Sequence, residues 1–320
     1  MRIGTAECIP GCISKGHVVL GEYPDGTDII SPVLIAAGNK SGPVLWMQGA
    51  IHGPEVGGVL GMVQFIRELA VADLSGTIIC LAVANPLGFR ANQRLTPQDG
   101  ANLNRLFPGK SDGTITEQIA YKIFGLVTKF ADAVIDFHSG GDHLICCHHA
   151  LFSNDGSDAG QLSERLARSA GTPNLWNVPI DFLAGAAFSS FIKYGKPALL
   201  IESGGGARVT EQDLKNYRDA IRGACQQMSM LPGRPPPLDY RIGQTANVLK
   251  STRGGIFFGS VEPGASATRN TELGRVVDLY GDVTETFHCP FDAAWVAAIR
   301  RPFMPIYSGE EVAEVVELTR

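Results

Sequence analysis

Apolar segments of strand length alternate with segments of helical periodicity between residues 44 and 231. The strand candidates are residues 44–47, 77–84, 133–137, 144–148 and 198–201. The helix candidates are residues 55–70, 116–130, 160–170 and 210–227. This alternation predicts an α/β fold whose mixed, largely parallel sheet is flanked by helices on both faces. Because open α/β sheets place ligands outside the carboxyl ends of their strands, the functional side chains are expected there.

The proline-rich segment LPGRPPP at residues 231–237 marks the best candidate boundary in the chain. Consecutive prolines cannot continue a helix and favour a stiff, extended connector. The sequence from residue 240 onward has short strand-like runs, glycine-containing turns and little helical signal. We therefore predict an α/β domain over residues 1–235 and a small β-rich domain over residues 236–320.

Three residues at two predicted strand ends have side chains that suit a metal ion. His52 and Glu55 follow the first apolar run, and His138 stands at the end of another run beside two glycines. Together they supply two imidazoles and one carboxylate, the ligand set of hydrolytic zinc sites that keep one coordination position open for water. The alternatives are that His52 and Glu55 only begin a helix, with the acid favouring the helix dipole, and that His138 binds backbone at a strand end.

Two further acids lie at strand ends. Asp136 precedes His138 by two residues, so both side chains can share one face of the strand, where the acid could orient the imidazole. Glu202 ends the apolar run 198–201 just before three glycines. An acid in this position costs stability unless it faces a cation or a pocket, and it could take a proton from a zinc-bound water. The alternative for Glu202 is a salt bridge at the strand end.

A turn-rich segment over residues 84–109 follows a predicted strand and is dense in asparagine and arginine. Arg94 and Arg105 are candidates for binding a substrate carboxylate, since a guanidinium group can bind a carboxylate with two hydrogen bonds. Asn104 could add an amide donor. The alternative is that these arginines are ordinary solvated surface residues.

Composition and charge exclude several classes of protein. The net charge is −5 and no basic block occurs, so nucleic acid is not an expected partner. No stretch approaches 18 uncharged apolar residues and no apolar signal segment begins the sequence, so we expect a soluble cytoplasmic protein without membrane association. The seven cysteines are scattered without CxxC spacing, which indicates neither a zinc knuckle nor a disulfide framework.

Four separated motifs, GAIHGPE, NPLGF through DGANLNRLFPG, DFHSGG and IESGGG, resemble the succinylglutamate desuccinylase/aspartoacylase family of the zinc carboxypeptidase superfamily. The resemblance covers roughly residues 15–310. It implies one Zn²⁺ bound by His52, Glu55 and His138, with Glu202 promoting attack of zinc-bound water on an amide carbonyl. It also implies that Arg94 stabilises the oxyanion that develops on the attacked amide carbonyl. Asn104 and Arg105 would bind the carboxylate of an N-acyl amino acid substrate.

The sequence departs from the family pattern at one position, and its C-terminal region has a parallel in the family. Asn102 stands where relatives commonly have an aspartate that supports a zinc-binding histidine. The C-terminal region resembles biotinyl/lipoyl modules, but its turn at residues 289–294 has no lysine to modify, so we expect it to shield the site or to mediate oligomerisation. The leading hypothesis is an N-acyl amino acid deacylase, with a dimer as the default oligomeric state. The alternatives are a metallocarboxypeptidase and a catalytically weak binding protein.

Overall fold

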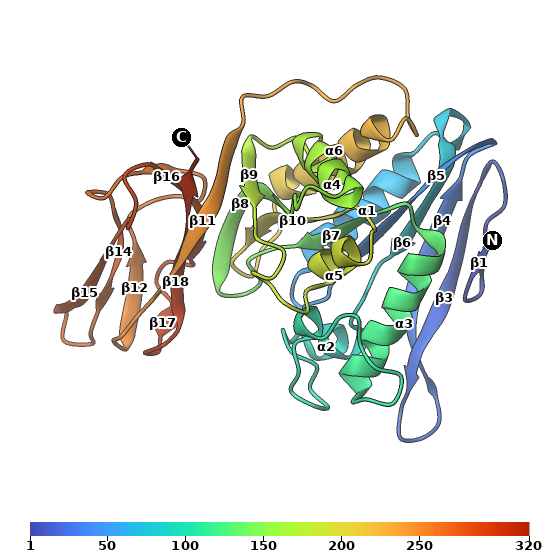
Figure 1. Ribbon diagram of the computed structural model, residues 1–320. Coiled ribbons are helices and arrows are strands. Elements are labelled where there is room, and N and C mark those ends of the chain that lie inside the picture. The colour runs from blue at the N-terminus through green and yellow to red at the C-terminus, as the bar shows by residue number, and fades with distance from the viewer. Residues whose placement is uncertain (320) are drawn as a thin grey trace.

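The computed structural model describes residues 1–319 (Figure 1). The helices are α1 (Val56–Glu68), α2 (Pro86–Ala91), α3 (Ile115–Phe130), α4 (Asp158–Arg168), α5 (Ala187–Lys193) and α6 (Glu211–Gln227), with 3₁₀ turns η1 (Val71–Asp73) and η2 (Leu103–Arg105). Strands up to the proline-rich segment are β1 (Arg2–Ile3), β2 (Ala6–Glu7), β3 (Cys12–Glu22), β4 (Asp28–Ala37), β5 (Lys40–Gly49), β6 (Ser75–Leu81), β7 (Ala133–His138), β8 (Leu144–Phe152), β9 (Asn174–Asn177) and β10 (Ala198–Gly205). Later strands are β11 (Arg241–Lys250), β12 (Gly255–Gly259), β13 (Ser266–Ala267), β14 (Glu272–Val277), β15 (Val283–His288), β16 (Ala294–Arg300), β17 (Pro305–Ile306) and β18 (Glu311–Leu318).

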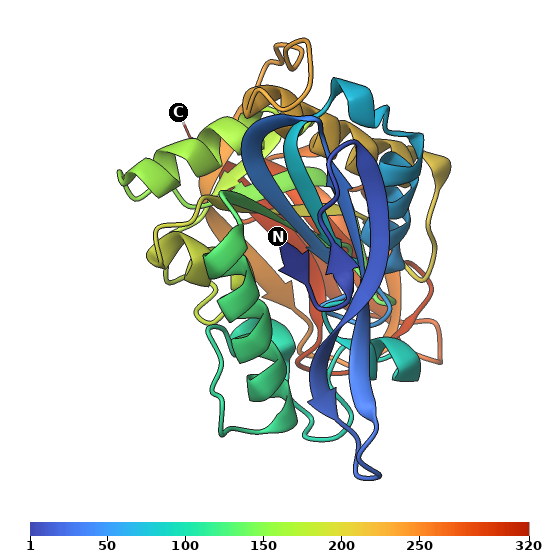
Figure 2. The same ribbon diagram turned by 90° about the vertical axis from the view of Figure 1, so that its right-hand side faces the viewer.

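The main sheet has the strand order β13-β16-β18-β11-β9-β8-β10-β7-β5-β6-β4-β3. Its centre, β6-β5-β7-β10, is parallel, as the alternation of strands and helices predicted. β7 is buried along its whole length, as expected for a strand covered on both faces. Antiparallel pairs join β8 to β10 and β4 to β6, and the β3–β4 hairpin forms the edge seen in Figure 2. The sheet is therefore mixed, and it is parallel over a smaller part than we predicted.

The helices cover both faces of this sheet. Buried side chains of α1, α4 and α6 pack with one face, and those of α3 and α5 pack with the other (Figure 1). α3 and α6 each begin with a capping box, Thr114 with Glu117 and Thr210 with Asp213, which satisfies backbone N–H groups at the helix start. No helix in the described part of the chain combines the length and apolarity that a bilayer crossing requires.

The C-terminal strands extend the main sheet as well as forming a second one. β11 pairs in parallel with β9, and β16 pairs with both β18 and β8, so β8, β9, β11, β18 and β16 close into a ring. β15, β14, β12 and β17 form a separate four-stranded sheet. The C-terminal region is β-rich as predicted, but it is continuous with the main sheet because its strands bond to β8 and β9. The division at residues 235 and 236 stays a prediction.

Close packing of α1 against α6 and β7 holds the strand ends in position. A Cβ atom at Gly61 would lie 2.5 Å from Cβ of Tyr217, and one at Gly58 would lie 2.5 Å from Cβ of Phe137. The buried Tyr217 hydroxyl lies 2.7 Å from the carbonyl oxygen of His138 and 2.5 Å from that of Ser203. Tyr217 therefore ties α6 to the ends of β7 and β10, and the glycines of α1 leave the space that its ring needs.

We predict that Gly61→Ala destabilises the protein by about 1–3 kcal/mol, because the added methyl group overpacks a dense interface. Gly125→Ala in α3 is the matched control, since a Cβ there meets nothing within 4 Å. Removing a glycine from an exposed helical position should be neutral or stabilise by about 0.5–1 kcal/mol. Urea denaturation followed by circular dichroism measures both variants, and equal stabilities would contradict the packing argument.

Candidate functional site

His52, Glu55 and His138 come together at the carboxyl end of the sheet, although α1, β6, α2 and α3 separate Glu55 from His138 in the sequence. His52 and Glu55 lie in the turn between β5 and α1, and His138 is the last residue of β7. Nδ1 of His52 is 2.8 Å from Oε1 of Glu55, and Nδ1 of His138 is 2.9 Å from Oε2 of the same carboxylate. Each of the three buried side chains can offer one ligand atom, and these atoms lie within 4.8 Å of one another.

The turn that presents His52 is fixed by α2. The Gly53 N–H donates to the carbonyl oxygen of Gln93 at 3.0 Å, and a Cβ at Gly53 would lie 2.1 Å from the carbonyl oxygen of Gly88. Asn85 caps α2 through the Gly88 N–H and donates its amide to the carbonyl oxygen of Ile51. The glycine is required by this close approach. The two loops therefore support each other beside the site.

The far nitrogen of each imidazole faces a side-chain oxygen. Nε2 of His138 is 3.1 Å from Oδ2 of Asp136, and Nε2 of His52 is 3.1 Å from Oδ1 of Asn102. Such partners orient a ligating imidazole and leave its other nitrogen free for the metal. Asn102 Oδ1 also accepts the Asn104 N–H at 2.9 Å, which starts η2. The residue that departs from the family pattern thus occupies the supporting position expected of the aspartate.

The charges in this cluster depend on one another. Burial would raise the pKa of Glu55, but His52 and His138 overcome this and hold it far below its usual range. Burial would lower the pKa of His138, but Asp136 and Glu55 raise it well above 6.5. The pKa of His52 is lowered, mainly by burial. Without a metal ion, a protonated His138 therefore supplies the positive charge that the buried carboxylates require.

Glu202 lies beside this cluster because β10 and β7 pair in parallel with Glu202 opposite His138. Its Oε2 atom is buried and has no hydrogen-bond partner within residues 1–319. Burial raises the pKa of Glu202 to about 8, the charge of Glu55 adds to the rise, and His138 and Arg94 oppose it. A buried carboxylate without a partner is costly, so this side chain is placed to receive a proton or to face a cation.

Arg94 lies on the open side of the metal-ligand cluster. Its Nη1 is 3.1 Å from Oε1 of Glu55 and 3.2 Å from Nδ1 of His52, and its side chain is 55% exposed. Because this side chain is not enclosed by the protein, the guanidinium group can move toward a ligand. This position is compatible with contact to a substrate that approaches the cluster from solvent.

Asn104 and Arg105 are not among the residues that line the cavity described next. The buried Asn104 side chain accepts the N–H of Ala187 at the start of α5, at 2.9 Å. Nη1 of Arg105 donates to the carbonyl oxygen of Asn104 at 2.6 Å. Burial and the charge of Arg94 lower the pKa of Arg105, and Glu314 opposes them, so its guanidinium is within electrostatic reach of both. Their binding of a substrate carboxylate stays a prediction.

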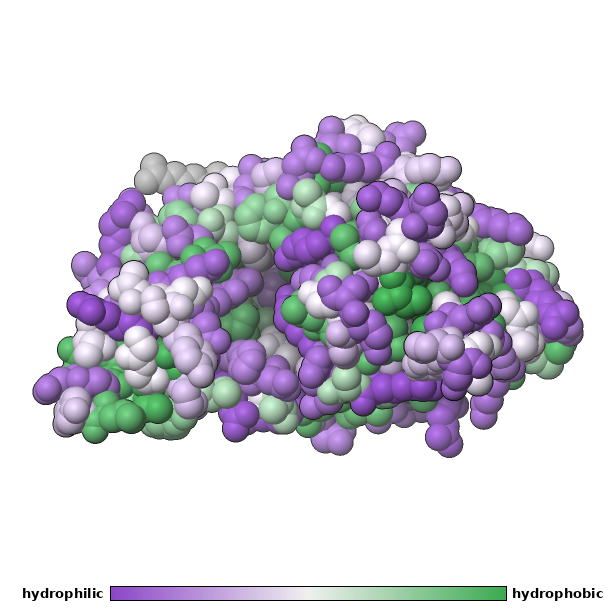
Figure 3. All heavy atoms as spheres, turned by 90° about the horizontal axis from the view of Figure 1, so that it is seen from below, coloured by the Kyte–Doolittle hydropathy of each residue, from purple (hydrophilic) through white to green (hydrophobic). Residues whose placement is uncertain are grey.

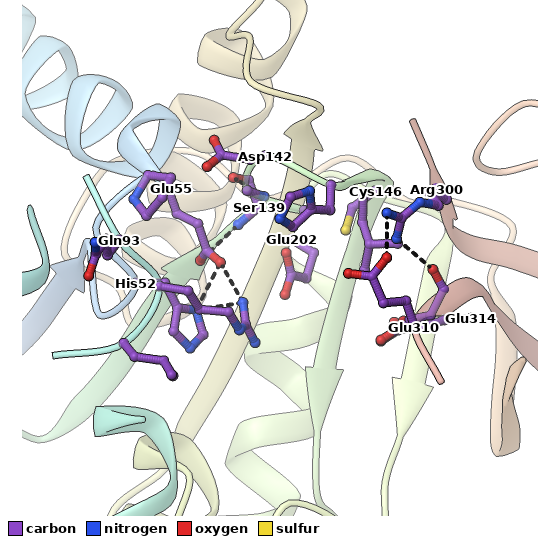
Figure 4. Close-up of a pocket in the computed structure, with 18 of the residues that line it drawn as sticks. His52, Glu55, Gln93, Ser139, Asp142, Cys146, Glu202, Arg300, Glu310 and Glu314 are labelled. Carbon is purple, nitrogen blue, oxygen red and sulfur yellow. Dashed lines mark hydrogen bonds and ion pairs between the residues drawn. The ribbon is translucent and has the colours of Figure 1, made fainter. Parts of the chain in front are cut away.

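A cavity of about 570 Å³ is lined by His52, Glu55, Arg94 and Glu202 and by a wall whose residues we did not predict, although we expected the C-terminal region to shield the site. This wall comes from the C-terminal strands and consists of Arg300, Glu310, Glu311 and Glu314, seen in part in Figure 4. The β16–β8 pairing brings Arg300 opposite Leu144. Figure 3 shows the surface hollowed between the C-terminal strands and the α/β layers. One signal was available, because Glu314 interrupts an apolar strand much as Glu202 does.

The neighbouring histidines of β8 form no second metal site. His148 bonds backbone, with Nε2 3.0 Å from the carbonyl oxygen of Ala170, while the ring of His149 packs edge-on against Trp295. In the part of the chain that the structure describes, the only group of three potential metal ligands is the one formed by His52, Glu55 and His138. All seven cysteines are free thiols, and Cys12 among them is exposed.

Comparison with known proteins places this geometry in context. A curated relative from Halomonas elongata, named N-alpha-acetyl-L-2,4-diaminobutyric acid deacetylase, is 26% identical over 91% of this chain and 86% of its own length. The product-bound ectoine utilization protein EutE (DoeB) from Ruegeria pomeroyi superposes with a TM-score of 0.85 at 24% identity, covering 99% of both chains. An aspartoacylase family protein from Mesorhizobium loti gives a TM-score of 0.83 at 25% identity, covering 100% of both chains.

The family model for the succinylglutamate desuccinylase/aspartoacylase catalytic domain matches residues 41–227, which include the metal-ligand cluster, Arg94 and Glu202. This match spans more than half of the chain, and it agrees with the four motifs and with the superposed structures. The chain belongs to the succinylglutamate desuccinylase/aspartoacylase family.

Proposed function

We propose that this protein is a zinc-dependent deacylase that hydrolyses the amide bond of an N-acyl amino acid or a related small carboxylate. The observation that carries the proposal is the convergence of His52, Glu55 and His138 beside Glu202, whose Oε2 atom has no hydrogen-bond partner in the described chain. The Halomonas relative supports the reaction type, since its name describes removal of an acetyl group from an amino acid.

The donor set fits zinc. Two imidazoles and one carboxylate are the ligands of hydrolytic zinc sites, and both imidazoles have the supporting oxygen that such ligands require. Zinc bound there would polarise the amide carbonyl and lower the pKa of a water molecule to about 7. The negative charge of Glu55, now balanced by protonated His138, would be balanced by the ion instead.

Two side chains of the cavity would transfer the proton and stabilise the developing negative charge. Glu202 accepts a proton from the attacking water and delivers it to the amide nitrogen as the carbon–nitrogen bond breaks, leaving a carboxylate and an amine. Arg94, released from Glu55, donates to the carbonyl oxygen as negative charge develops on it. The C-terminal wall limits the length of a substrate in the cavity, which favours a small acylated amino acid over a peptide.

We predict that Glu202→Gln lowers kcat by about 100- to 10,000-fold, because an amide cannot accept the proton of the attacking water. The isosteric change leaves the three metal ligands in place, so zinc content, measured by atomic emission, should equal that of the wild type. Amine release from N-acyl amino acids measures the rate, and a chelator should abolish activity in the wild type. A variant that retains full activity would remove Glu202 from the reaction.

We predict that Asn102→Asp tightens zinc binding by about 10- to 100-fold, because a charged acceptor strengthens His52 as a ligand. An aspartate can keep the backbone contact that starts η2, so the fold should be unaffected. Asp136→Asn removes the charge of the acceptor beside His138 and is the matched comparison. It should weaken zinc binding by a similar factor. Competition with a fluorescent chelator measures both, and a loss of affinity in Asn102→Asp would contradict the supporting role of this residue.

We predict that zinc binding releases a proton at pH 7. Because the pKa of His138 lies well above 6.5, its Nδ1 is protonated in the metal-free protein and must lose that proton to bind zinc. Affinity should therefore rise with pH by about tenfold per unit until the raised pKa of His138 is passed. Calorimetry in buffers of different ionisation enthalpy counts the released protons, and a pH-independent affinity would refute the assignment.

A further inference from the structure

Two carboxylates on the C-terminal wall, those of Glu311 and Glu314, have no cationic partner in the described structure. Both residues belong to β18 and line the cavity, and Figure 4 shows Glu314 on the opposite side of it from His52 and Glu55. Oε1 of Glu311 is buried and makes no hydrogen bond within residues 1–319. No lysine, arginine or histidine of that range lies within 4.0 Å of either carboxylate. The cavity therefore has two acidic side chains without an ion-pair partner in the described chain at the end away from His52 and Glu55.

The cation of the same wall is already engaged. Arg300 is buried, and its Nη2 donates to Oε2 of Glu310 at 2.8 Å and to the carbonyl oxygen of Pro305 at 2.6 Å. Its Nη1 donates to the backbone carbonyl oxygen of Glu311 at 3.3 Å. Glu310 is held further by the Tyr307 N–H at 2.9 Å. This pair fixes the turn before β18 and leaves the side chains of Glu311 and Glu314 to face the cavity.

The charge of Glu311 opposes the ionisation of Glu314. Burial and the neighbouring charge of Glu311 raise the pKa of Glu314 well above its usual range, and Glu202 adds to the rise while Arg94 opposes it. Like charges in a partly enclosed site are costly until a cation arrives between them. A positively charged ligand would lower the energy of both side chains, whereas a negatively charged one would meet repulsion from each.

We propose that Glu311 and Glu314 bind a side-chain ammonium group of the substrate, so that the substrate is an N-α-acyl diamino acid. The inference rests on the proposed deacylase function and adds the class of amino acid. An ammonium group carries three N–H donors, which suit two carboxylates. A second metal ion fits less well, because Ca²⁺ and Mg²⁺ require about six oxygen ligands. The same wall disfavours substrates with an acidic side chain, such as an acylated aspartate or glutamate.

The test compares substrates that differ in charge alone. N-α-acetyl diamino acids with two, three or four side-chain methylene groups are offered to the zinc-loaded protein beside analogues in which a methyl group replaces the ammonium. N-α-acetylglutamate represents the acidic class. We expect kcat/KM to be at least about tenfold higher for one ammonium substrate than for its methyl analogue, the factor expected for a hydrogen-bonded charge. The side-chain length of the preferred substrate indicates the distance from the metal site to the carboxylates of Glu311 and Glu314.

The variants Glu311→Gln and Glu314→Gln remove one charge each with little change in shape. We expect each to lower kcat/KM for the ammonium substrate by about 10- to 100-fold while the methyl analogue is unchanged or improved. Glu317→Gln, on the same strand but not in the cavity wall, is the matched control and should leave the ratio of the two rates unaltered. Melting temperatures establish that all three variants are folded.

The outcomes separate the two proposals. If the wild type cleaves methyl or acidic analogues as well as ammonium substrates, the deacylase stands and the ammonium site is refuted. If both variants lose kcat/KM equally on every substrate, the carboxylates position Arg94 or Arg105. That result would also refute the ammonium site. If no amide is cleaved, the deacylase function fails, and calorimetry with the free diamino acids decides the site. Binding by the wild type that Glu314→Gln abolishes would support the site, and absence of binding would overturn it.

Discussion

The carboxylate of Glu55 is the interaction on which the site depends. One oxygen faces Nδ1 of His52 and the other faces Nδ1 of His138, so a single side chain joins the β5–α1 turn to the end of β7. Arg94 and the Ser139 N–H approach the same carboxylate. A buried anion of this kind is stable only with a compensating positive charge, which either a protonated histidine or a metal ion can supply. The geometry is therefore prepared before any ion arrives.

The side chains of the candidate site could be predicted from the sequence because their positions follow from local patterns. His138 and Glu202 each end an apolar run, and parallel pairing of adjacent strands necessarily brings their carboxyl ends to one edge of the sheet. The same reasoning brings His52 and Glu55 there through the turn after β5. Asp136 followed from the two-residue period of a strand, and its oxygen does lie beside the His138 imidazole.

The remaining features of the fold and the site could not be predicted from local patterns, because they depend on contacts between distant parts of the chain. Nothing in the sequence near residue 300 indicates that β16 pairs with β8, and only this pairing brings the acidic wall to the cavity. The β-rich character of the C-terminal region was predictable, but its continuity with the main sheet was not. In the segment before α3, sequence spacing could not show that Asn102 turns toward His52 while the side chain of Asn104 turns away to α5. Side-chain direction in a short 3₁₀ turn is set by packing.

The closed ring of β8, β9, β11, β18 and β16 also orders events during synthesis of the protein. The candidate metal ligands and Glu202 leave the ribosome well before β16 and β18. Before these strands arrive, the sheet edge that carries His52, Glu55 and Glu202 lacks the wall formed by Arg300, Glu311 and Glu314. Pairing of β16 with β8 then closes the ring and encloses the candidate site behind this wall, so the enclosure of the site depends on strands that are made long after its own residues.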